Sequence, residues 1–384
     1  MGFERPARRI FDEDHDAFRA AFRSFLAREA LPKVQGWKEA GVIDREFWTA
    51  AAANGFVAFS APVEYGGLGV VDFRYNAIVD EEVVYAGAAS DAFTLTNDIV
   101  GPYLFDLTDD EQKARWLPGV TDGSIVAAIA MTEPGTGSDL RGIATTAVWN
   151  GHEYVINGSK TFITSGIQAD LVIVAARVER PGVDGLGLFV VEKAMPGFSR
   201  GRKLDKIGRK AQDTAELFFE DVRVSPANVL GDVGRGLRLM MRNLAQERLA
   251  MAVTAIADVE FVLELTVDYV SQRRAFGQPI GSFQANRFSI AEMVTQARIG
   301  RIYVDDCISR HLSGDLTDAE AAGAKFWATD LQWCVLDQSL QLFGGYGYME
   351  EYEIATRWKD ARVQRIYGGT NEIMKEIVGR SVGL

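Results

Sequence analysis

The spacing of apolar residues predicts helices in the first third of the chain. Phe18, Phe22 and Phe25 recur every three or four positions, which places them on one face of a helix. Further on, Thr108–Glu111 has the form of a capping box, in which a Thr and a Glu three residues later satisfy free amides at a helix start. Residues 12–122 are therefore expected to form helices joined by loops.

The hydrophobic pattern changes to short β-rich runs between residues 124 and 228. The runs are Ile125–Ala130, Thr145–Trp149, Tyr154–Ile156, Thr161–Thr164, Leu171–Val178, Leu186–Val191 and Ala215–Phe219. Asn157-Gly158 separates two of them and is a strong signal for a hairpin turn. Many short strands at close spacing predict an antiparallel barrel or sandwich, and they argue against a parallel sheet with alternating helices.

The helical period returns at Gly236 and continues to the end of the chain. A long helix is expected to end at Gly277-Gln278-Pro279, and further helices are expected near residues 283–312, 318–343 and 371–380. The pattern as a whole predicts an α+β protein with the order helical, β, helical. The expected domains are residues 1–123, 124–234 and 235–384.

Composition limits the classes of protein that this chain can represent. Of its 384 residues, 47% are hydrophobic and 24% are charged, which is typical of a globular protein with a large core. No apolar run approaches the ~20 residues of a membrane helix. The net charge of −12 argues against a general nucleic-acid binder. With only two cysteines and no apolar segment after the first basic residues, a reducing cytoplasmic location is expected.

Several common catalytic motifs are absent from the sequence. There is no G-x-G-x-x-G after a strand, no Walker loop and no G-x-S-x-G elbow. Cys307 and His311 are four residues apart and could share a helix face, but two ligands do not make a zinc site, which needs three or four. No metal site is therefore expected.

One loop points to a ligand and, by resemblance, to a family. Met131–Leu140 follows an expected strand and is rich in small and hydroxyl residues, so its amides could approach an anionic or heteroaromatic ligand. This stretch resembles the flavin-binding signature of the acyl-CoA dehydrogenase family. Four further stretches resemble other motifs of that family, in the same order: Asn157–Gly166, Gln272–Ile280, Gln341–Tyr348 and Ile366–Glu372. The resemblance implies a helical N-terminal domain, a middle antiparallel β-barrel domain and a C-terminal four-helix-bundle domain.

The long-chain members of the family resemble this sequence most, particularly over Lys206–Glu220 and Ile366–Glu376. One departure from the common family pattern bears on the mechanism. Many members carry their catalytic Glu immediately before the Gly-Thr of the C-terminal motif, where this sequence has Gly368. Long-chain and isovaleryl members place the base on the long helix that opens the C-terminal domain. By this resemblance the base would be Glu247, although periodicity alone would make it an ordinary surface residue.

The implied reaction is the α,β-dehydrogenation of an acyl-CoA thioester to a trans-2-enoyl-CoA, with FAD as cofactor. Glu247 would remove the α-proton and flavin N5 would accept the β-hydride. Burial is expected to raise the pKa of Glu247 toward the working pH. The backbone N–H of Gly368 and a ribityl hydroxyl of the flavin would polarise the thioester carbonyl.

The resemblance also assigns residues to the cofactor. They are Ile129, Met131, Thr132, Gly137, Ser138, Phe162, Ile163, Thr164, Arg273, Phe276, Gln284, Gln341, Gly344, Gly345, Thr370 and Glu372. Thr132 and Thr164 would hydrogen-bond the isoalloxazine, and Phe162 would pack on it. Arg273 and Gln284, with the loop from Gln341, would reach the FAD of a neighbouring subunit.

The substrate and the partners follow from the same resemblance. Substrate-binding residues would be Ser138, Arg248, Tyr367, Gly368 and Gly369. Cofactor binding across subunits implies a homo-oligomer, and the family is usually a tetramer. Electron-transfer flavoprotein would reoxidise the cofactor.

Four alternatives share this fold. A branched-chain acyl-CoA dehydrogenase would differ only in substrate, and an acyl-CoA oxidase would pass electrons to O₂. A flavin-dependent hydroxylase would need no carboxylate base. A catalytically dead assembly protein would keep FAD for structure alone. The sequence favours a dehydrogenase for a medium or long straight acyl chain.

Overall fold

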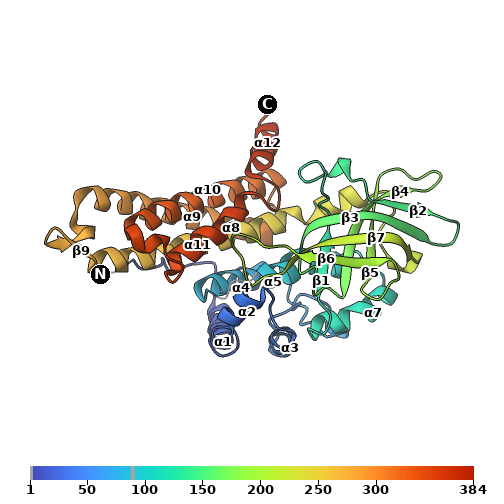
Figure 1. Cartoon of the computed structure of the whole chain (residues 1–384), viewed down its shortest axis with the longest axis horizontal. Coiled ribbons are helices and arrows are strands. Elements are labelled where there is room, and N and C mark those ends of the chain that lie inside the picture. Colours follow the sequence, from blue (N-terminus) through green and yellow to red (C-terminus); the bar gives the residue numbers. More distant parts are fainter. Residues whose placement is uncertain (1–2, 88–90) are drawn as a thin grey trace.

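The computed structural model describes residues 3–87 and 91–384. A β-sheet and a bundle of long helices lie at opposite ends, and shorter N-terminal helices pack beneath their junction (Figure 1). The expected order of helical, β and helical segments is confirmed.

The N-terminal segment is helical, as predicted. Its α-helices are α1 (Glu13–Glu29), α2 (Val34–Ala40), α3 (Arg45–Ala53), α4 (Phe73–Tyr85), α5 (Asp91–Thr94), α6 (Gly101–Asp106) and α7 (Asp110–Thr121). Between α5 and α6 the chain forms a π-helical turn, η2 (Leu95–Val100). π-turns of this kind occur frequently at functional sites.

The capping box before α7 lies one residue later than predicted. Asp109 is the N-cap, its carboxylate accepts from the Gln112 amide, and the Gln112 side chain accepts from the Asp109 amide. The predicted box at Thr108 and Glu111 is wrong because Thr108 instead bonds back to the carbonyl of Leu104.

The middle segment forms one sheet with the strand order β6-β7-β3-β2-β4-β5-β8, and β1 pairs with β4. The strands are β1 (Ala127–Ala130), β2 (Thr146–Trp149), β3 (Tyr154–Thr164), β4 (Leu171–Glu179), β5 (Leu186–Glu192), β6 (Phe198–Lys203), β7 (Thr214–Val224) and β8 (Val229–Leu230). Most neighbours are antiparallel, but β4 pairs in parallel with both β1 and β2. The expectation of a purely antiparallel domain is therefore wrong at β4.

The hairpin predicted at Asn157-Gly158 is also wrong, because these residues lie inside the continuous strand β3. The register against β7 shifts between Ile156 and Gly158, which marks an irregularity of the β-bulge type. Gly158 has a φ of 150°, and a Cβ there would overlap Thr145. The Asn157 side chain exchanges two hydrogen bonds with Asp221 on β7, so it pairs the strands and does not turn the chain.

The C-terminal segment contains the long helices that were predicted. They are α8 (Gly236–Gln272), α9 (Gln284–Leu312), α10 (Asp318–Phe343), α11 (Glu353–Ala361) and α12 (Asn371–Ser381), with a small hairpin of β9 (Arg274–Ala275) and β10 (Gln278–Pro279) after α8. Neither α11 nor this hairpin was anticipated, and the predicted end of the long helix at Gly277-Gln278-Pro279 is wrong, because α8 ends at Gln272 and the chain turns into the hairpin. Among the described residues, none of the helices combines the length and apolar character that crossing a membrane requires.

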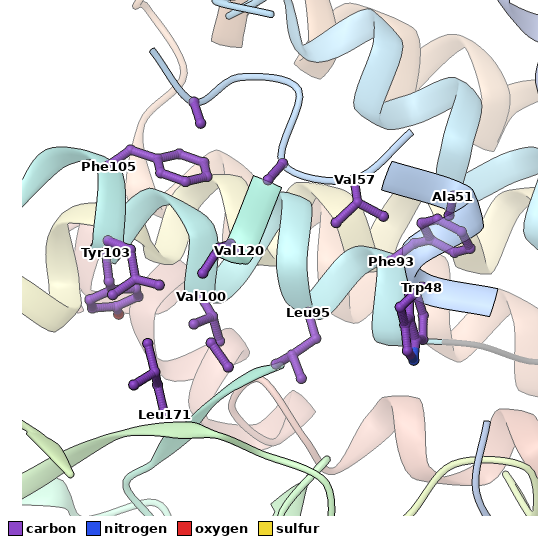
Figure 2. Packing of buried hydrophobic residues seen from close by; sticks show 14 of the residues in the cluster. Trp48, Ala51, Val57, Phe93, Leu95, Val100, Tyr103, Phe105, Val120 and Leu171 are labelled. Carbon is purple, nitrogen blue, oxygen red and sulfur yellow. The ribbon is translucent and has the colours of Figure 1, made fainter. Parts of the chain in front are cut away.

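A shared hydrophobic core joins the N-terminal helices to one face of the sheet. Figure 2 shows Trp48, Phe93 and Tyr103 from the helices in the same cluster as Leu171 from β4. A second cluster covers the other sheet face, and two further clusters lie among α8, α9 and α10. The sheet is thereby fixed against the helices that lead into η2 and α8.

Candidate active site

The carboxyl of Glu247 is buried where α8 passes the N-terminal helices, with 6% of the residue exposed. The Tyr103 hydroxyl donates to Glu247 Oε1 at 3.3 Å, and Asn243 Nδ2 donates to the same oxygen at 3.3 Å. Burial raises the pKa of Glu247 to about 7, although these hydrogen bonds favour the ionised form. A carboxylate with such a pKa is suited to accept a proton near neutral pH.

The π-turn η2 is tied to α8 directly beside this carboxyl. Asn243 Nδ2 donates to the backbone carbonyl of Asp98 at 3.0 Å, and Gln246 Nε2 donates to the same carbonyl at 3.2 Å. These amides from two successive turns of α8 satisfy a carbonyl of the irregular helix. The position of the Glu247 carboxyl thus depends on how η2 and α8 fit together.

Gly368 lies in the loop before α12 and faces α8 at Met251, one turn beyond Glu247. Its φ of 61° is a conformation that side chains rarely adopt, and a Cβ would overlap the end of Met251. Lys325 Nζ, fully buried on α10, donates to the Gly369 carbonyl at 2.7 Å and to Asn371 Oδ1 at 2.9 Å. Lys325 therefore holds the loop that presents the Gly368 amide.

Two predicted substrate neighbours lie in this region. Arg248 is 6% exposed, and its Nε has no hydrogen-bond partner among the described residues. Burial lowers the pKa of Arg248 below that of a free guanidinium. Tyr367 is half-buried in the same loop as Gly368. A buried guanidinium nitrogen without a partner is costly, so this position fits a bound acceptor group.

A buried ion pair supports the loop that begins at Met131. Lys160 Nζ donates to Glu133 Oε1 at 2.8 Å and to the Met131 carbonyl at 3.0 Å. The other contacts of Glu133 are backbone amides, at Ala144 and Thr145. Lys160 has no exposed surface, so it fixes the loop from inside. The predicted residues Thr132, Gly137 and Ser138 are half-buried or exposed on this supported loop, whereas Ile129 is half-buried in β1.

The bulged end of β3 turns an aromatic ring outward. Phe162 has a φ of 60° and is 68% exposed, although its neighbour Ile163 is buried. The register against β7 shifts between Lys160 and Ile163, which gives Phe162 its unusual direction. Thr164 ends the strand and is half-buried. An exposed ring held in a strained backbone is well suited to pack on a planar ligand.

Six of the predicted cofactor residues lie at the far end of the helical bundle. Arg273 follows α8 and is 26 residues from Glu247, about 39 Å along a helix that rises ~1.5 Å per residue. The hairpin β9–β10 beside it is remote from the sheet (Figure 1). The further members of this end group are Phe276, Gln284, Gln341, Gly344 and Gly345. The predicted cofactor residues therefore form two groups that are far apart within one chain.

Thr370 and Glu372 lie at the start of α12, close in sequence to Gly368. The Thr370 hydroxyl caps this helix by accepting from the Ile373 amide at 3.3 Å, and Glu372 is exposed in the first turn. The helix start leaves its first amides available to an anion.

No group of three or more His, Cys, Asp or Glu side chains that could hold a metal ion occurs within the described ranges. Cys307 is buried, and His311 is half-buried with Nε2 at 3.3 Å from Gln246 Oε1. Gln246 on α8 thus partly covers His311.

Sequence reasoning missed the residues that support the site from inside. They are Lys160, Glu133, Lys325, Tyr103 and Asp98. A signal was present in two of them: each lysine interrupts an otherwise apolar strand or helix face, and a lysine is almost never fully buried unless it is paired. The partner of each lysine could not be deduced from the sequence, because the two members of a pair are distant in sequence or are separated by a loop.

Models of the three acyl-CoA dehydrogenase domains match nearly the whole chain. The N-terminal domain model matches residues 12–124, the middle domain model 128–222 and the C-terminal domain model 234–383. The chain therefore belongs to the acyl-CoA dehydrogenase family, whose members are FAD-dependent enzymes.

Individual relatives refine this result. The chain is 45% identical over 378 residues to the mitochondrial long-chain specific acyl-CoA dehydrogenase of Rattus norvegicus, covering 98% of this chain and 88% of the relative. It is 33% identical over 374 residues to the mitochondrial isovaleryl-CoA dehydrogenase of Pongo abelii, covering 96% and 88%. A crystal structure of an acyl-CoA dehydrogenase from Geobacillus kaustophilus is similar with a TM-score of 0.95 at 46% identity, covering 98% and 100%. The resemblance to the long-chain group is confirmed.

The ion pair under the first loop gives a test of how that loop is held. Lys160→Met leaves Glu133 buried without its cation, so the free energy of unfolding should fall by about 3–5 kcal/mol. Adding Glu133→Gln should recover part of the loss, because an amide oxygen can still accept from the backbone amides. Urea unfolding followed by tryptophan fluorescence measures both variants.

Lys193→Met is the matched control, because Lys193 pairs with Asp170 while its side chain is 60% exposed. Its loss should cost less than about 1 kcal/mol. Equal stability of Lys160→Met and Lys193→Met would contradict a supporting role for the buried pair.

Proposed function

We propose that this protein is an FAD-dependent acyl-CoA dehydrogenase that converts a medium or long straight-chain acyl-CoA to its trans-2-enoyl-CoA. The observation that carries the proposal is the buried carboxyl of Glu247, which forms no ion pair. It lies opposite Gly368, at the place where many relatives carry their base. Family membership and the similarity to a long-chain relative support the same reaction.

The residues present fit a bound flavin. Phe162 offers an exposed ring on a strained bulge, and a Cβ at Gly135 or Gly137 would meet nothing within 4 Å, so the first loop has open space around it. In the proposal, Thr132 and Thr164 bond the isoalloxazine while Ser138 approaches the pyrophosphates. Bound FAD would supply the acceptor for the β-hydride.

Glu247 is proposed to take the α-proton on its carboxylate. In the free site, Tyr103 and Asn243 hold that carboxylate by hydrogen bonds to one oxygen, which leaves Oε2 for the substrate. The amide of Gly368 would donate to the thioester oxygen and stabilise the charge that develops there. Lys325 keeps this amide in place through the Gly369 carbonyl. Arg248 and Tyr367 complete the proposed substrate surroundings.

The acyl chain is proposed to run along α8 away from the base. A cavity of about 460 Å³ lies farther along this helix. Val83, Val84 and Thr254 line part of it, but much of its wall is charged, including Lys38, Asp80, Asp258, Glu353, Arg357 and Asp360. Thr254 is seven residues beyond Glu247, about 10 Å along the helix. The charged part of this wall should limit the length over which added methylenes still increase the affinity for the acyl chain.

A panel of acyl-CoA thioesters tests the function and the length preference together. Anaerobic addition of the preferred acyl-CoA should bleach the flavin absorbance. kcat/KM should rise with length by up to about 0.8 kcal/mol per methylene, or roughly fourfold, until the chain meets the charged wall. A sharp optimum at four carbons or at isovaleryl-CoA would contradict the straight-chain assignment. Absence of bleaching by any thioester would favour the non-enzymatic assembly protein.

The same preparation distinguishes the electron acceptors. Reoxidation by electron-transfer flavoprotein without oxygen consumption is expected, whereas rapid oxygen consumption would identify an oxidase. We also propose a cytoplasmic location, which cell fractionation would test.

Replacing the base gives the second test. Glu247→Gln keeps the size and polarity of the side chain but cannot accept a proton, so turnover should fall at least ~10²-fold while FAD and product still bind. In the unchanged protein, kcat/KM should rise as the pH increases through about 7, because burial raises the pKa of Glu247 to about 7 and only the ionised form is a base. Near-normal turnover of Glu247→Gln would exclude this residue as the base.

Moving the base to position 368 gives the third test. A Glu there must adopt a positive φ and displaces Met251 from its place on α8. The double variant Glu247→Gly with Gly368→Glu should therefore recover little, whereas adding Met251→Ala should make turnover at least ~10-fold faster, since misplacement by 1 Å can cost ~10²-fold. Met251→Ala alone is the control. If the triple and double variants have the same turnover, the two positions do not serve one α-carbon.

The two separated groups of cofactor residues support a homo-oligomer, proposed to be a tetramer. Phe276 is 95% exposed at the end of the bundle, and Phe288 and Ile302 on α9 are 60% and 71% exposed. Such apolar surface suits contact with a second copy. Arg273 and Gln341 would then reach the neighbour's FAD. Sedimentation at decreasing protein concentration measures the dissociation of the oligomer. FAD should be released as the oligomer dissociates, and a monomer that retains FAD would contradict the binding of one FAD by two subunits.

A further inference from the structure

The cavity of about 460 Å³ lies on the same face of α8 as Glu247. Thr254 and Asp258, which line it, follow Glu247 by seven and eleven residues, and this spacing keeps residues on one side of a helix. The chain from residue 357 to residue 368 runs along this face in the opposite direction. Three contacts align it with α8: Arg357 with Asp258 at 2.6 Å, Gln364 with Thr254 at 3.5 Å, and Gly368 with Met251.

The helical turns of α5 and η2 form a second wall that also reaches from the cavity to Glu247. Thr94 on α5 lines the cavity, and the Asp98 carbonyl, one turn later, accepts from Asn243 beside Glu247. The interval contains the buried apolar side chains of Leu95 and Met251. A chain that starts at Glu247 and follows α8 between these two walls therefore ends in the cavity.

The wall of the cavity is polar on its inner side and acidic as a whole. Asp258, Arg357 and Gln364 are all buried there, and the Thr94 hydroxyl donates to Asp80 at 2.6 Å. Counted over the described residues, the lining holds six acids and three basic residues. A methyl group gains little beside such groups, because their contact with water is lost without a new hydrogen bond. A carboxylate would meet mainly negative charge.

We propose that the cavity receives the far end of the acyl chain and that this end carries a hydroxyl group, so that the substrates include ω-hydroxyacyl-CoA thioesters. This inference rests on the proposed function. A hydroxyl both donates and accepts hydrogen bonds, and it carries no charge that the acidic lining would repel. Glu350 and Glu351 are exposed at the rim, so water can also reach the group.

The distances along α8 set the length of such a chain. Thr254 is about 10 Å from Glu247 along the helix, and Asp258 is about 16 Å from it. Since an extended chain advances ~1.2 Å per bond, about ten carbons reach Thr254 and about sixteen reach Asp258. An eight-carbon chain ends before the cavity, whereas a fourteen-carbon chain ends inside it.

The test compares chains that differ only at the far end. The holoenzyme is assayed with CoA thioesters of eight and fourteen carbons that end in a methyl, a hydroxyl or a carboxyl group, with an artificial electron acceptor. At eight carbons the hydroxyl should lower kcat/KM at least ~10-fold, because it is desolvated among apolar side chains. At fourteen carbons the hydroxyl chain should react at least as fast as the methyl chain. The carboxyl chain should be at least ~10-fold slower than the hydroxyl chain, because like charges repel.

A variant at the inner edge of the cavity tests the contact itself. Thr254→Val removes a hydroxyl and keeps the shape of the side chain. At fourteen carbons it should lower the ratio of kcat/KM for the hydroxyl chain to kcat/KM for the methyl chain by ~5-fold, the usual effect of one hydrogen bond. Thr266→Val is the matched control, because Thr266 is also buried on α8 and donates to the Val262 carbonyl at 2.6 Å, but does not line the cavity. It should leave the ratio unchanged.

The unchanged enzyme decides the inference even if Thr254→Val does not fold. An equal loss caused by the hydroxyl at both lengths would overturn the inference, and so would a carboxyl chain that reacts as fast as the hydroxyl chain at fourteen carbons. Either result with flavin bleaching by methyl chains would leave the proposed function standing. Absence of bleaching by every thioester would instead refute the proposed function and this inference together.

Discussion

Complete burial of one stretch of α8 is the constraint on which the structure depends. From Glu247 to Glu260 every residue of this helix is buried, because the N-terminal helices cover one side and α9 and α10 cover the other. A helix enclosed on all sides has to be apolar or has to satisfy each polar group. The polar residues on this stretch therefore reveal which positions serve structure and which serve chemistry.

Three acids on the buried stretch illustrate this difference. Asp258 contacts Arg357, and Glu260 contacts Arg301, so both charges are compensated. Glu247 has only the neutral hydrogen-bond donors Tyr103 and Asn243, and no Lys or Arg of the described residues forms an ion pair with it. Removing a charge from water without a cation is costly, and the result is a raised pKa. The lack of an ion pair thus destabilises the ionised form of Glu247 and makes this carboxyl suited to accept a proton near neutral pH.

The loops around the site are held from beneath in the same manner. Lys160 fixes the first loop and Lys325 fixes the loop of Gly368, each as a buried ammonium donating to a backbone carbonyl. Phe162, which is assigned to the flavin, is mostly exposed, so its ring contributes little to the packing of the core. Rigid support beneath exposed groups is what a preorganised site requires.

The sequence by itself determined the order of helical and β segments, the long C-terminal helices and the family. These features depend on local periodicity and on short motifs, which neighbouring residues encode. Only the tertiary structure decided the parallel pairings of β4, the continuous strand through Asn157, the outward turn of Phe162 and the pairing of buried charges. Each of these depends on partners far away in the chain, as Glu81 and Arg301 are, and a local pattern carries no information on which distant group will compensate a charge or accept a strand.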